Sequence, residues 1–130
     1  MNAKGKPMKQ PMYIHRMDGE PLAVAGLWTA WRDRAEGPEA PWLHSATVVT
    51  TSANTTMTPV HDRMPVILPA SRWAEWLDPV NDDLAALTGL LVPAADDLLT
   101  MHEVSTEVNN VRNKGPHLVD PVEHAGVTLF

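Results

Sequence analysis

Three consecutive residues, His61, Asp62 and Arg63, place an imidazole, a carboxylate and a guanidinium side by side between Pro59 and Pro65. A histidine titrates near neutral pH and can serve as a general acid or base. An arginine can hold a phosphate or a carboxylate through parallel hydrogen bonds. The same residues also fit a simple turn, in which the imidazole bonds a backbone carbonyl and Asp62 pairs with Arg63. Their spacing leaves both interpretations open.

Two further polar segments could contribute to a site with His61. Thr50 lies near the end of the β-branched run 46–51 and could direct its hydroxyl into the same cleft. The run 109–113, Asn-Asn-Val-Arg-Asn, contains Arg112. Asparagine side chains often bond their own backbone in turns, so this run favours a structural brace, but it could equally support a buried polar site or bond a phosphate.

Several chemistries are excluded by residue type. The chain has no cysteine, which excludes a disulfide scaffold, a thiolate zinc site and a cysteine nucleophile within it. Its six histidines form no His-x-His or His-Glu-x-x-His pattern, so we expect no metal site. Neither a Gly-x-x-x-x-Gly-Lys phosphate loop nor a Gly-x-Ser-x-Gly nucleophile elbow occurs. We therefore expect no bound cofactor.

The composition fits a single globular domain. The chain has 130 residues, 44% of them hydrophobic, and five tryptophans that could fill a core. Its net charge of −6 means that any nucleic-acid binding must depend on a local basic patch. Basic residues cluster at Lys4, Lys6, Lys9 and Arg16, and again at Arg112 and Lys114. Without an apolar signal segment or a stretch of membrane-spanning length, the sequence favours a soluble cytoplasmic protein.

Short strands must position these polar residues. A hairpin is predicted from strand 12–16, a turn at Asp18-Gly19 and strand 22–27, because Asp-Gly between apolar runs favours a tight turn. Strand 22–27 is apolar on both faces, which is typical of a strand covered from both sides. Further strands are expected at 44–51, at 66–68 and near 101–105.

Short helices are expected after the second apolar strand. The first is capped by Ser71 and carries Trp73, Trp76 and Leu77 on one apolar stripe. The others are expected at 81–88, with Asp82 and Asp83 in the first turn, and at 93–99.

The order of these elements predicts an α+β fold, in which a mixed, mostly antiparallel sheet forms a partly closed barrel with short peripheral helices. The two tryptophans at helical spacing are expected in its core. Trp28, Trp31 and Trp42 are also expected to be core residues, although each could instead offer a stacking surface to a base.

Several blocks of the sequence resemble one known family, the SRAP proteins (SOS response-associated peptidases, or abasic site processing proteins). They are KQPMYIHRMDGEPLAVAGLW (9–28), TVVTTSAN (47–54), VHDRMPVILP (60–69) and VSTEVNNVRN (104–113). The blocks occur in the order expected for that family, and the likeness extends over nearly the whole chain, from about residue 9 to residue 122.

The resemblance implies binding of single-stranded DNA and covalent capture of abasic sites in the DNA damage (SOS) response. In that family, an N-terminal cysteine attacks the ring-opened sugar aldehyde and forms a thiazolidine crosslink, while a glutamate and a histidine assist proton transfer. The same cysteine is linked to autoproteolysis. By this resemblance His61 corresponds to the active-site histidine, and Thr50, Asn54, Arg63 and Arg112 are expected to contact DNA.

The sequence also departs from the family pattern. The Met-Cys-Gly-Arg start, the Asn-Ala-Arg block and the Trp-x-Glu-Trp segment of the family are absent, and Met1 is followed by Asn2. The expected organisation is therefore a flexible loop at 1–10, the C-terminal part of an SRAP-like domain at 11–122 and a tail at 123–130. Without a thiol, the family's crosslinking reaction is not expected from this chain alone.

The sequence leaves three functional hypotheses. The chain could be the C-terminal part of an abasic-site processing protein that becomes active when its missing N-terminal half is supplied. It could be an inactive remnant that binds single-stranded DNA weakly. It could also be an interaction module whose exposed sheet edge pairs with that missing half.

Overall fold

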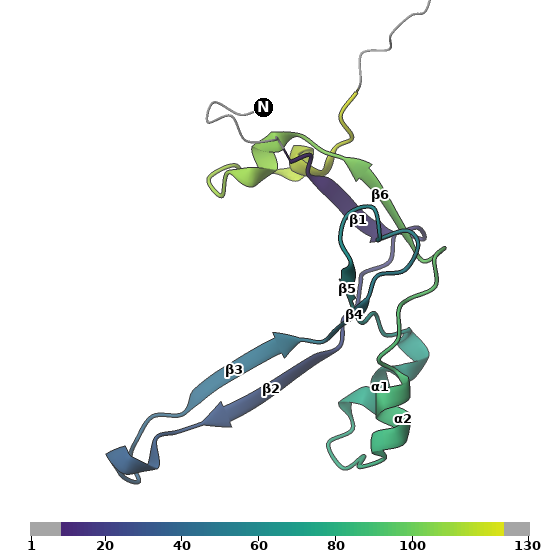
Figure 1. Cartoon of the computed structure of the whole chain (residues 1–130). Coiled ribbons are helices and arrows are strands. Elements are labelled where there is room, and N and C mark those ends of the chain that lie inside the picture. Colours follow the sequence, from purple (N-terminus) through teal and green to yellow (C-terminus); the bar gives the residue numbers. More distant parts are fainter. Residues whose placement is uncertain (1–8, 124–130) are drawn as a thin grey trace, which may run out of the picture.

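A computed structural model describes residues 9–123 (Figure 1). Its strands are β1 (Met12–Arg16), β2 (Gly26–Trp31), β3 (Leu43–Val48), β4 (Thr50–Ser52), β5 (Arg63–Pro65) and β6 (Leu99–Glu103). Its α-helices are α1 (Trp73–Leu77) and α2 (Leu84–Gly89), and single 3-10 turns are η1 (Arg34–Glu36), η2 (Ala70–Arg72), η3 (Thr106–Asn109) and η4 (Pro116–Val119). The predicted tail at 123–130 and most of the predicted loop at 1–10 lie outside the described residues.

The expected α+β class with antiparallel strands and short helices is confirmed, but the partly closed barrel is wrong. In the described part of the chain the strands form three separate antiparallel pairs, β1 with β6, β2 with β3 and β4 with β5. The pairs meet where three backbones cross: the amide of Ala25 donates to Val66 O at 2.8 Å, that of Val66 to Val49 O at 2.9 Å, and that of Val49 to Ala25 O at 2.9 Å. Because each strand pair leaves this crossing in its own direction, no continuous sheet closes (Figure 1).

The predicted hairpin from strands 12–16 and 22–27 is also wrong. The turn itself forms, since Gly19 has φ +76° and its amide donates to Arg16 O at 3.1 Å. However, β1 pairs with β6, nearly ninety residues further along the chain, where Ile14 faces Met101. That pairing packs Ile14 and Met101 against the core. The free energy gained by burying this apolar surface exceeds the entropy saved by closing the short loop of a local hairpin.

The core lies at and beside the crossing. One cluster consists of Met57, Met64, Ile67 and Leu99, and a second consists of Ala25, Val66 and Leu68. The segment 66–68 is therefore buried as its apolar sequence predicted, but it is not a regular strand, because only Ile67 makes a bridge, to Val24. The predicted strand 44–51 is likewise divided at Val49 into β3 and β4.

The β2–β3 ribbon extends away from this core (Figure 1). No residue of either strand is buried, and Trp28 is 75% exposed. The expectation that Trp28, Trp31 and Trp42 are core residues is wrong for this chain, since each is more than half exposed. The strand predicted at 22–27 was expected to be covered on both faces, but only Ala25 in this segment is buried.

The helical region begins with a 3-10 turn rather than a Ser71 cap. The η2 turn is preceded by Pro69 and leads directly into α1, without a side-chain cap. The indole of Trp73 donates to Leu68 O at 2.9 Å, while Leu77 is 74% exposed, so the predicted apolar stripe is only partly buried.

The second predicted helix is shorter than expected. It begins after Asp83, whose carboxylate caps it by accepting from the amide of Ala86 at 3.0 Å. The predicted helix at 93–99 does not form, because Leu99 begins β6. None of the helices described between residues 9 and 123 has the length and hydrophobicity to cross a bilayer.

Candidate nucleic-acid site

The candidate site lies on the loop 53–62 that joins β4 to β5. The loop is closed at its base by the amide of Ala53, which donates to Asp62 O at 2.9 Å, and it turns through amides that donate to Asn54 O and Met57 O. Met57 is 6% exposed and packs with Met64 in the core. Met57, together with the partly buried Ala53, therefore anchors the loop to the core.

Asn54 braces the loop from within. Its side chain is buried, its Oδ1 accepts from the amide of Met57 at 3.0 Å, and its Nδ2 donates to Ala94 O at 3.0 Å and Ala95 O at 3.3 Å. Next to it, the amide of Thr55 donates to an Asp96 carboxylate oxygen at 2.7 Å. In this arrangement the Asn54 amide holds the loop to the segment before β6, and its expected contact with DNA stays a prediction.

Arg63 is fixed on Thr50. Its Nε donates to Thr50 Oγ1 at 3.1 Å, and its Nη2 donates to the same hydroxyl at 2.6 Å and to Thr50 O at 3.0 Å. Arg63 faces Ser52 across the ladder, so its side chain runs along β4 to reach Thr50. Within residues 9–123 the remaining Nη1 has no partner, which leaves one edge of an oriented guanidinium open to a ligand.

His61 Nδ1 has two neighbours that require opposite protonation states. It lies 3.0 Å from the amide of Arg63, which can only donate, and 2.9 Å from an Asp62 carboxylate oxygen, which accepts. When Nδ1 is unprotonated it accepts from Arg63, and when it carries a proton it can donate to Asp62. The imidazole therefore keeps a hydrogen-bond partner whether Nδ1 carries a proton or not, and its side chain is 65% exposed to solvent.

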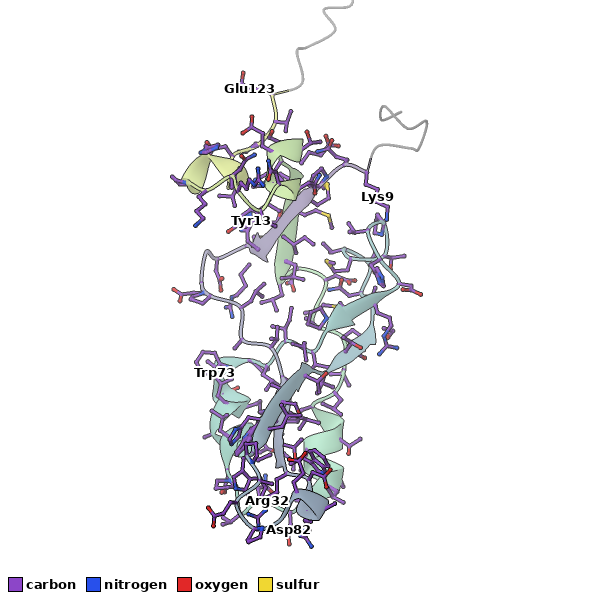
Figure 2. The ribbon with its side chains drawn as sticks, turned by 90° about the vertical axis from the view of Figure 1, so that its left-hand side faces the viewer. Lys9, Tyr13, Arg32, Trp73, Asp82 and Glu123 are labelled. Atoms are coloured by element: carbon purple, nitrogen blue, oxygen red, sulfur yellow. The ribbon has the colours of Figure 1, made fainter. Side chains whose placement is uncertain are left out.

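The structure thus brings together three of the predicted residues, Thr50, His61 and Arg63, and sets Arg112 apart. The segment between η3 and η4, which contains Arg112, lies at the outer end of the β1–β6 pair, away from the loop 53–62 in both views (Figures 1 and 2). The amide of Arg112 donates to Asn110 Oδ1 at 3.1 Å, so this run of asparagines forms turns as the structural interpretation predicted. Within the described residues, no group of three or more potential ligands could hold a metal ion.

Sequence reasoning missed an aromatic cluster on the β1–β6 pair. Tyr13 stacks on His15 with ring centroids 5.1 Å apart, and His102 completes the group at 5.4 and 5.7 Å from these two rings. Each imidazole is held by a backbone carbonyl, His15 Nδ1 by Arg16 O at 2.9 Å and His102 Nε2 by Val119 O at 2.8 Å. The alternation of Tyr13 and His15 along one strand was the signal for a shared face, but only the pairing with β6 adds the third ring.

At the end of β1, Arg16 and Asp18 form a bidentate ion pair, in which the arginine Nε donates to Oδ1 and its Nη2 donates to Oδ2 of the carboxylate. This hydrogen bond from Arg16, together with one from the Glu20 amide, lowers the pKa of Asp18 to about 2. The pair stabilises the turn and lies outside the loop that carries His61.

Comparison with known proteins supports the family suggested by the motifs. The family model for "SOS response associated peptidase (SRAP)" matches residues 2–111. The abasic site processing protein YoqW of Bacillus subtilis is 38% identical over 112 residues, covering 86% of this chain and 48% of YoqW. YedK of Escherichia coli, also named an abasic site processing protein, is 32% identical over 118 residues, covering 88% of this chain and half of YedK.

Structural similarity agrees with these matches. A crystal structure of a protein from Bacteroides thetaiotaomicron superposes with a TM-score of 0.74 at 25% identity, covering 89% of this chain and 50% of that protein. The chain therefore spans about half the length of the relatives that it matches. With a family model over most of its residues and the same fold as one half of a larger structure, this chain belongs to the SRAP family, the SOS response associated peptidases.

Proposed function

We propose that this chain acts on abasic sites in single-stranded DNA, with His61 moving protons at the damaged sugar and Arg63 holding a flanking phosphate. The observation that carries the proposal is the Arg63–Thr50 contact beside an exposed His61, in a chain whose relatives are abasic site processing proteins. An oriented guanidinium with a free edge suits a phosphate oxygen. An imidazole with a partner in either protonation state suits general acid–base chemistry.

The crosslinking reaction requires groups that the sequence does not contain. A thiazolidine forms when the thiol and amine of one terminal residue both bond to the sugar aldehyde carbon, whose oxygen leaves as water. This chain has no cysteine. We therefore propose that the thiol and the family's glutamate come from the remaining part of the SRAP domain, and that His61 assists the proton transfers that accompany ring opening and loss of water. A cytoplasmic location, where cellular DNA is accessible, forms part of this proposal.

Binding of fluorescent single-stranded DNA, with and without one abasic site, tests the phosphate role of Arg63. Arg63→Ala should weaken binding to both DNAs, because a phosphate contact does not depend on the damaged sugar. Arg34→Ala is the matched control, since Arg34 is an exposed arginine on the β2–β3 ribbon, and it should leave the affinity unchanged. Equal losses for the two variants would contradict a specific role for Arg63.

A crosslinking assay tests His61. In the presence of the remaining part of an SRAP domain, His61→Ala should slow formation of the covalent DNA band about 100-fold, as is typical of losing a general acid or base, with little change in DNA affinity. The chain alone should form no such band. A band formed by the chain alone and abolished by His61→Ala would require another nucleophile and would overturn the proposal.

A further inference from the structure

Asp96 joins the segment before β6 to the loop 53–62. Its carboxylate accepts from the amide of Thr55, and its backbone carbonyl accepts from Thr56 Oγ1, each at 2.7 Å. An ionised acceptor makes a hydrogen bond roughly twice as strong as a neutral acceptor does. Two successive residues in the first half of the loop are therefore tied to a single residue outside it.

The segment that carries Asp96 is itself held in place. The amide of Leu98 donates to Ala95 O at 3.1 Å, which closes a turn around Asp96. The carbonyl of Leu98 in turn accepts from the amide of Met17 at 3.0 Å. Leu99, at the start of β6, is 4% exposed and belongs to the core. Asp96 thus provides a fixed point from which the loop can be positioned.

The contact between the loop and this segment is made largely of hydrogen bonds. An open hollow of about 630 Å³ lies between them, lined by Thr58 and Pro59 on one side and by Pro93 and Ala95 on the other. Because the hollow is open, water can reach the contact. A change at Asp96, which is exposed, should therefore loosen the loop without leaving a dry cavity in the core.

The second half of the loop depends on the first. The amides of Val60 and His61 both donate to Met57 O, at 2.9 and 3.0 Å. Met57 directly follows Thr56, which is bound to the Asp96 carbonyl. The place of the imidazole is thus set by a carbonyl that is one residue away from the contact with the segment before β6.

We propose that Asp96 is a positioning residue for His61. By fixing the first half of the loop 53–62, it holds the imidazole where protons are transferred. The inference rests on the proposed function, in which His61 is the group that moves protons. Arg63 needs no such support, because it lies on β5 and its guanidinium is held by Thr50. Loss of the Asp96 contact should therefore impair proton transfer and leave phosphate binding intact.

Amide hydrogen exchange of the chain alone tests the positioning role without DNA. Asp96→Ala should speed exchange at the amide of His61 about 10-fold, because losing a hydrogen bond makes local opening of the loop easier. Asp96→Asn should keep the slow exchange, since an amide oxygen can still accept from Thr55. Asp97→Ala, at the exposed neighbouring position, is the matched control and should change nothing.

The crosslinking assay that tests His61 separates positioning from binding. At saturating abasic DNA, Asp96→Ala should slow formation of the covalent band about 10-fold, a smaller loss than removal of the imidazole itself causes. Its affinity for the DNA should stay unchanged, because a group that acts only on the reacting step lowers the rate and not the binding. Asp96→Asn should restore the rate.

Thr56→Val provides a second variant in case Asp96→Ala fails to fold. It removes only the hydroxyl that donates to Asp96 O and keeps the shape of the side chain. It should speed exchange at the amide of His61 in the same direction as Asp96→Ala. Urea unfolding of each variant checks that it is folded under the conditions of the exchange measurement.

Two results would overturn the proposal. One is unchanged exchange at the amide of His61 in both Asp96→Ala and Thr56→Val. The other is tighter DNA binding by Asp96→Ala without faster exchange, which would show that the carboxylate repels phosphates instead of positioning the loop. Failure of the proposed function looks different, since His61→Ala would then crosslink normally. If His61→Ala is slow and Asp96→Ala behaves as Asp97→Ala does, only the role of Asp96 is refuted.

Discussion

The centre of the molecule and the β2–β3 ribbon are built from similar apolar and β-branched sequences, yet their surroundings are opposite. Val66 at the crossing is fully buried, whereas Val48 on the ribbon is half exposed. At the crossing, three backbones satisfy one another's hydrogen bonds and clusters of side chains close over them. On the ribbon, every residue of β2 pairs in register with a residue of β3, but nothing described covers the side chains.

This difference separates two questions, whether a strand is to be buried and which segment buries it. Apolar residues on both faces of a strand indicate that the strand is to be buried. They do not indicate which segment will bury it. At the centre the cover comes from β1, β6 and the loop 53–62 of the same chain, while no segment described between residues 9 and 123 covers the ribbon. The loop that carries His61 belongs to the covered region, which explains how an exposed polar site can be held in place by a small core.

The largest expected effect comes from matched leucines in the two regions. Leu68→Ala should lower the free energy of unfolding by about 2–5 kcal/mol, because Leu68 is 4% exposed and its loss leaves a cavity. Leu43→Ala should change it by less than about 0.5 kcal/mol, because Leu43 is 63% exposed. Urea unfolding of both variants gives the comparison. Equal losses would mean that the ribbon is covered in the chain alone, and the contrast would disappear.

A smaller effect is expected from the polar brace of the covered region. Asn54→Ala should lower the free energy of unfolding by about 1–3 kcal/mol, because it leaves Ala94 O and Ala95 O without the donor that Asn54 provides. Asn110→Ala, at an exposed turn, should cost less than about 0.5 kcal/mol. Hydrogen exchange should also become faster in the loop 53–62. If Asn54→Ala weakened DNA binding without changing stability or exchange, the amide would contact DNA directly.

The third prediction compares two arginines by the salt dependence of DNA binding. Arg63→Ala should reduce the slope of log K against log salt by about 0.7, the amount expected for one lost phosphate contact on a single strand. Arg32→Ala on the ribbon should leave the slope unchanged, since its guanidinium is engaged with Trp42 and Pro38. Titrations between low and moderate salt measure both slopes. A reduced slope for Arg32→Ala alone would move the DNA site to the ribbon.

The smallest effect is expected at the turn after β1, outside both regions. The folded-state pKa of Asp18 is lowered from 3.8 to about 2, so its pairing with Arg16 contributes stability that is fully present above pH 3.8 and is lost as the pH falls through about 2. The melting temperature of the natural chain should therefore fall slightly more between pH 5 and pH 2 than that of Asp18→Asn. Because half of the Asp18 carboxylate is exposed, water and salt weaken the pairing. Identical pH profiles would show that the pair contributes nothing to stability.

Local signals in the sequence were reliable where a single turn or residue type decided the structure. The Asp18-Gly19 turn formed as expected. The predicted Ser71 cap did not form, and Asp83, expected within the first turn of a helix, caps α2 instead. The apolar segment 66–68 was buried as expected. The predictions failed where strand pairing joined two segments that are far apart in the sequence. Residues 12–16 pair with 99–103 rather than with the nearby 22–27, a choice that no local pattern encodes.

The sequence likewise predicted only some residues of the candidate site, and the structure revealed the others. The sequence pattern suggested His61, Arg63 and Thr50, and the structure brings these residues together across β4 and β5. In the structure the Asn54 side chain is buried, and the η3–η4 segment, which contains Arg112, lies away from the loop 53–62. Asp96 and the carbonyls before β6, which hold the loop, carry no sequence signal, because backbone groups become partners only when the chain brings them within hydrogen-bond distance.

By itself, the sequence determined the residue types available for chemistry: a histidine and an arginine between prolines, no thiol, and motifs of the SRAP family. Its apolar pattern also predicted a strand at 22–27 covered on both faces, of which only Ala25 is buried. Only the tertiary structure decided that Arg63 lies on Thr50, that Asn54 supports the loop, and that the β2–β3 ribbon remains uncovered. The reason is physical: residue type fixes what a group can donate, accept or bury, whereas its partner is fixed by long-range packing, in which segments far apart in the chain compete to remove the same apolar surface from water.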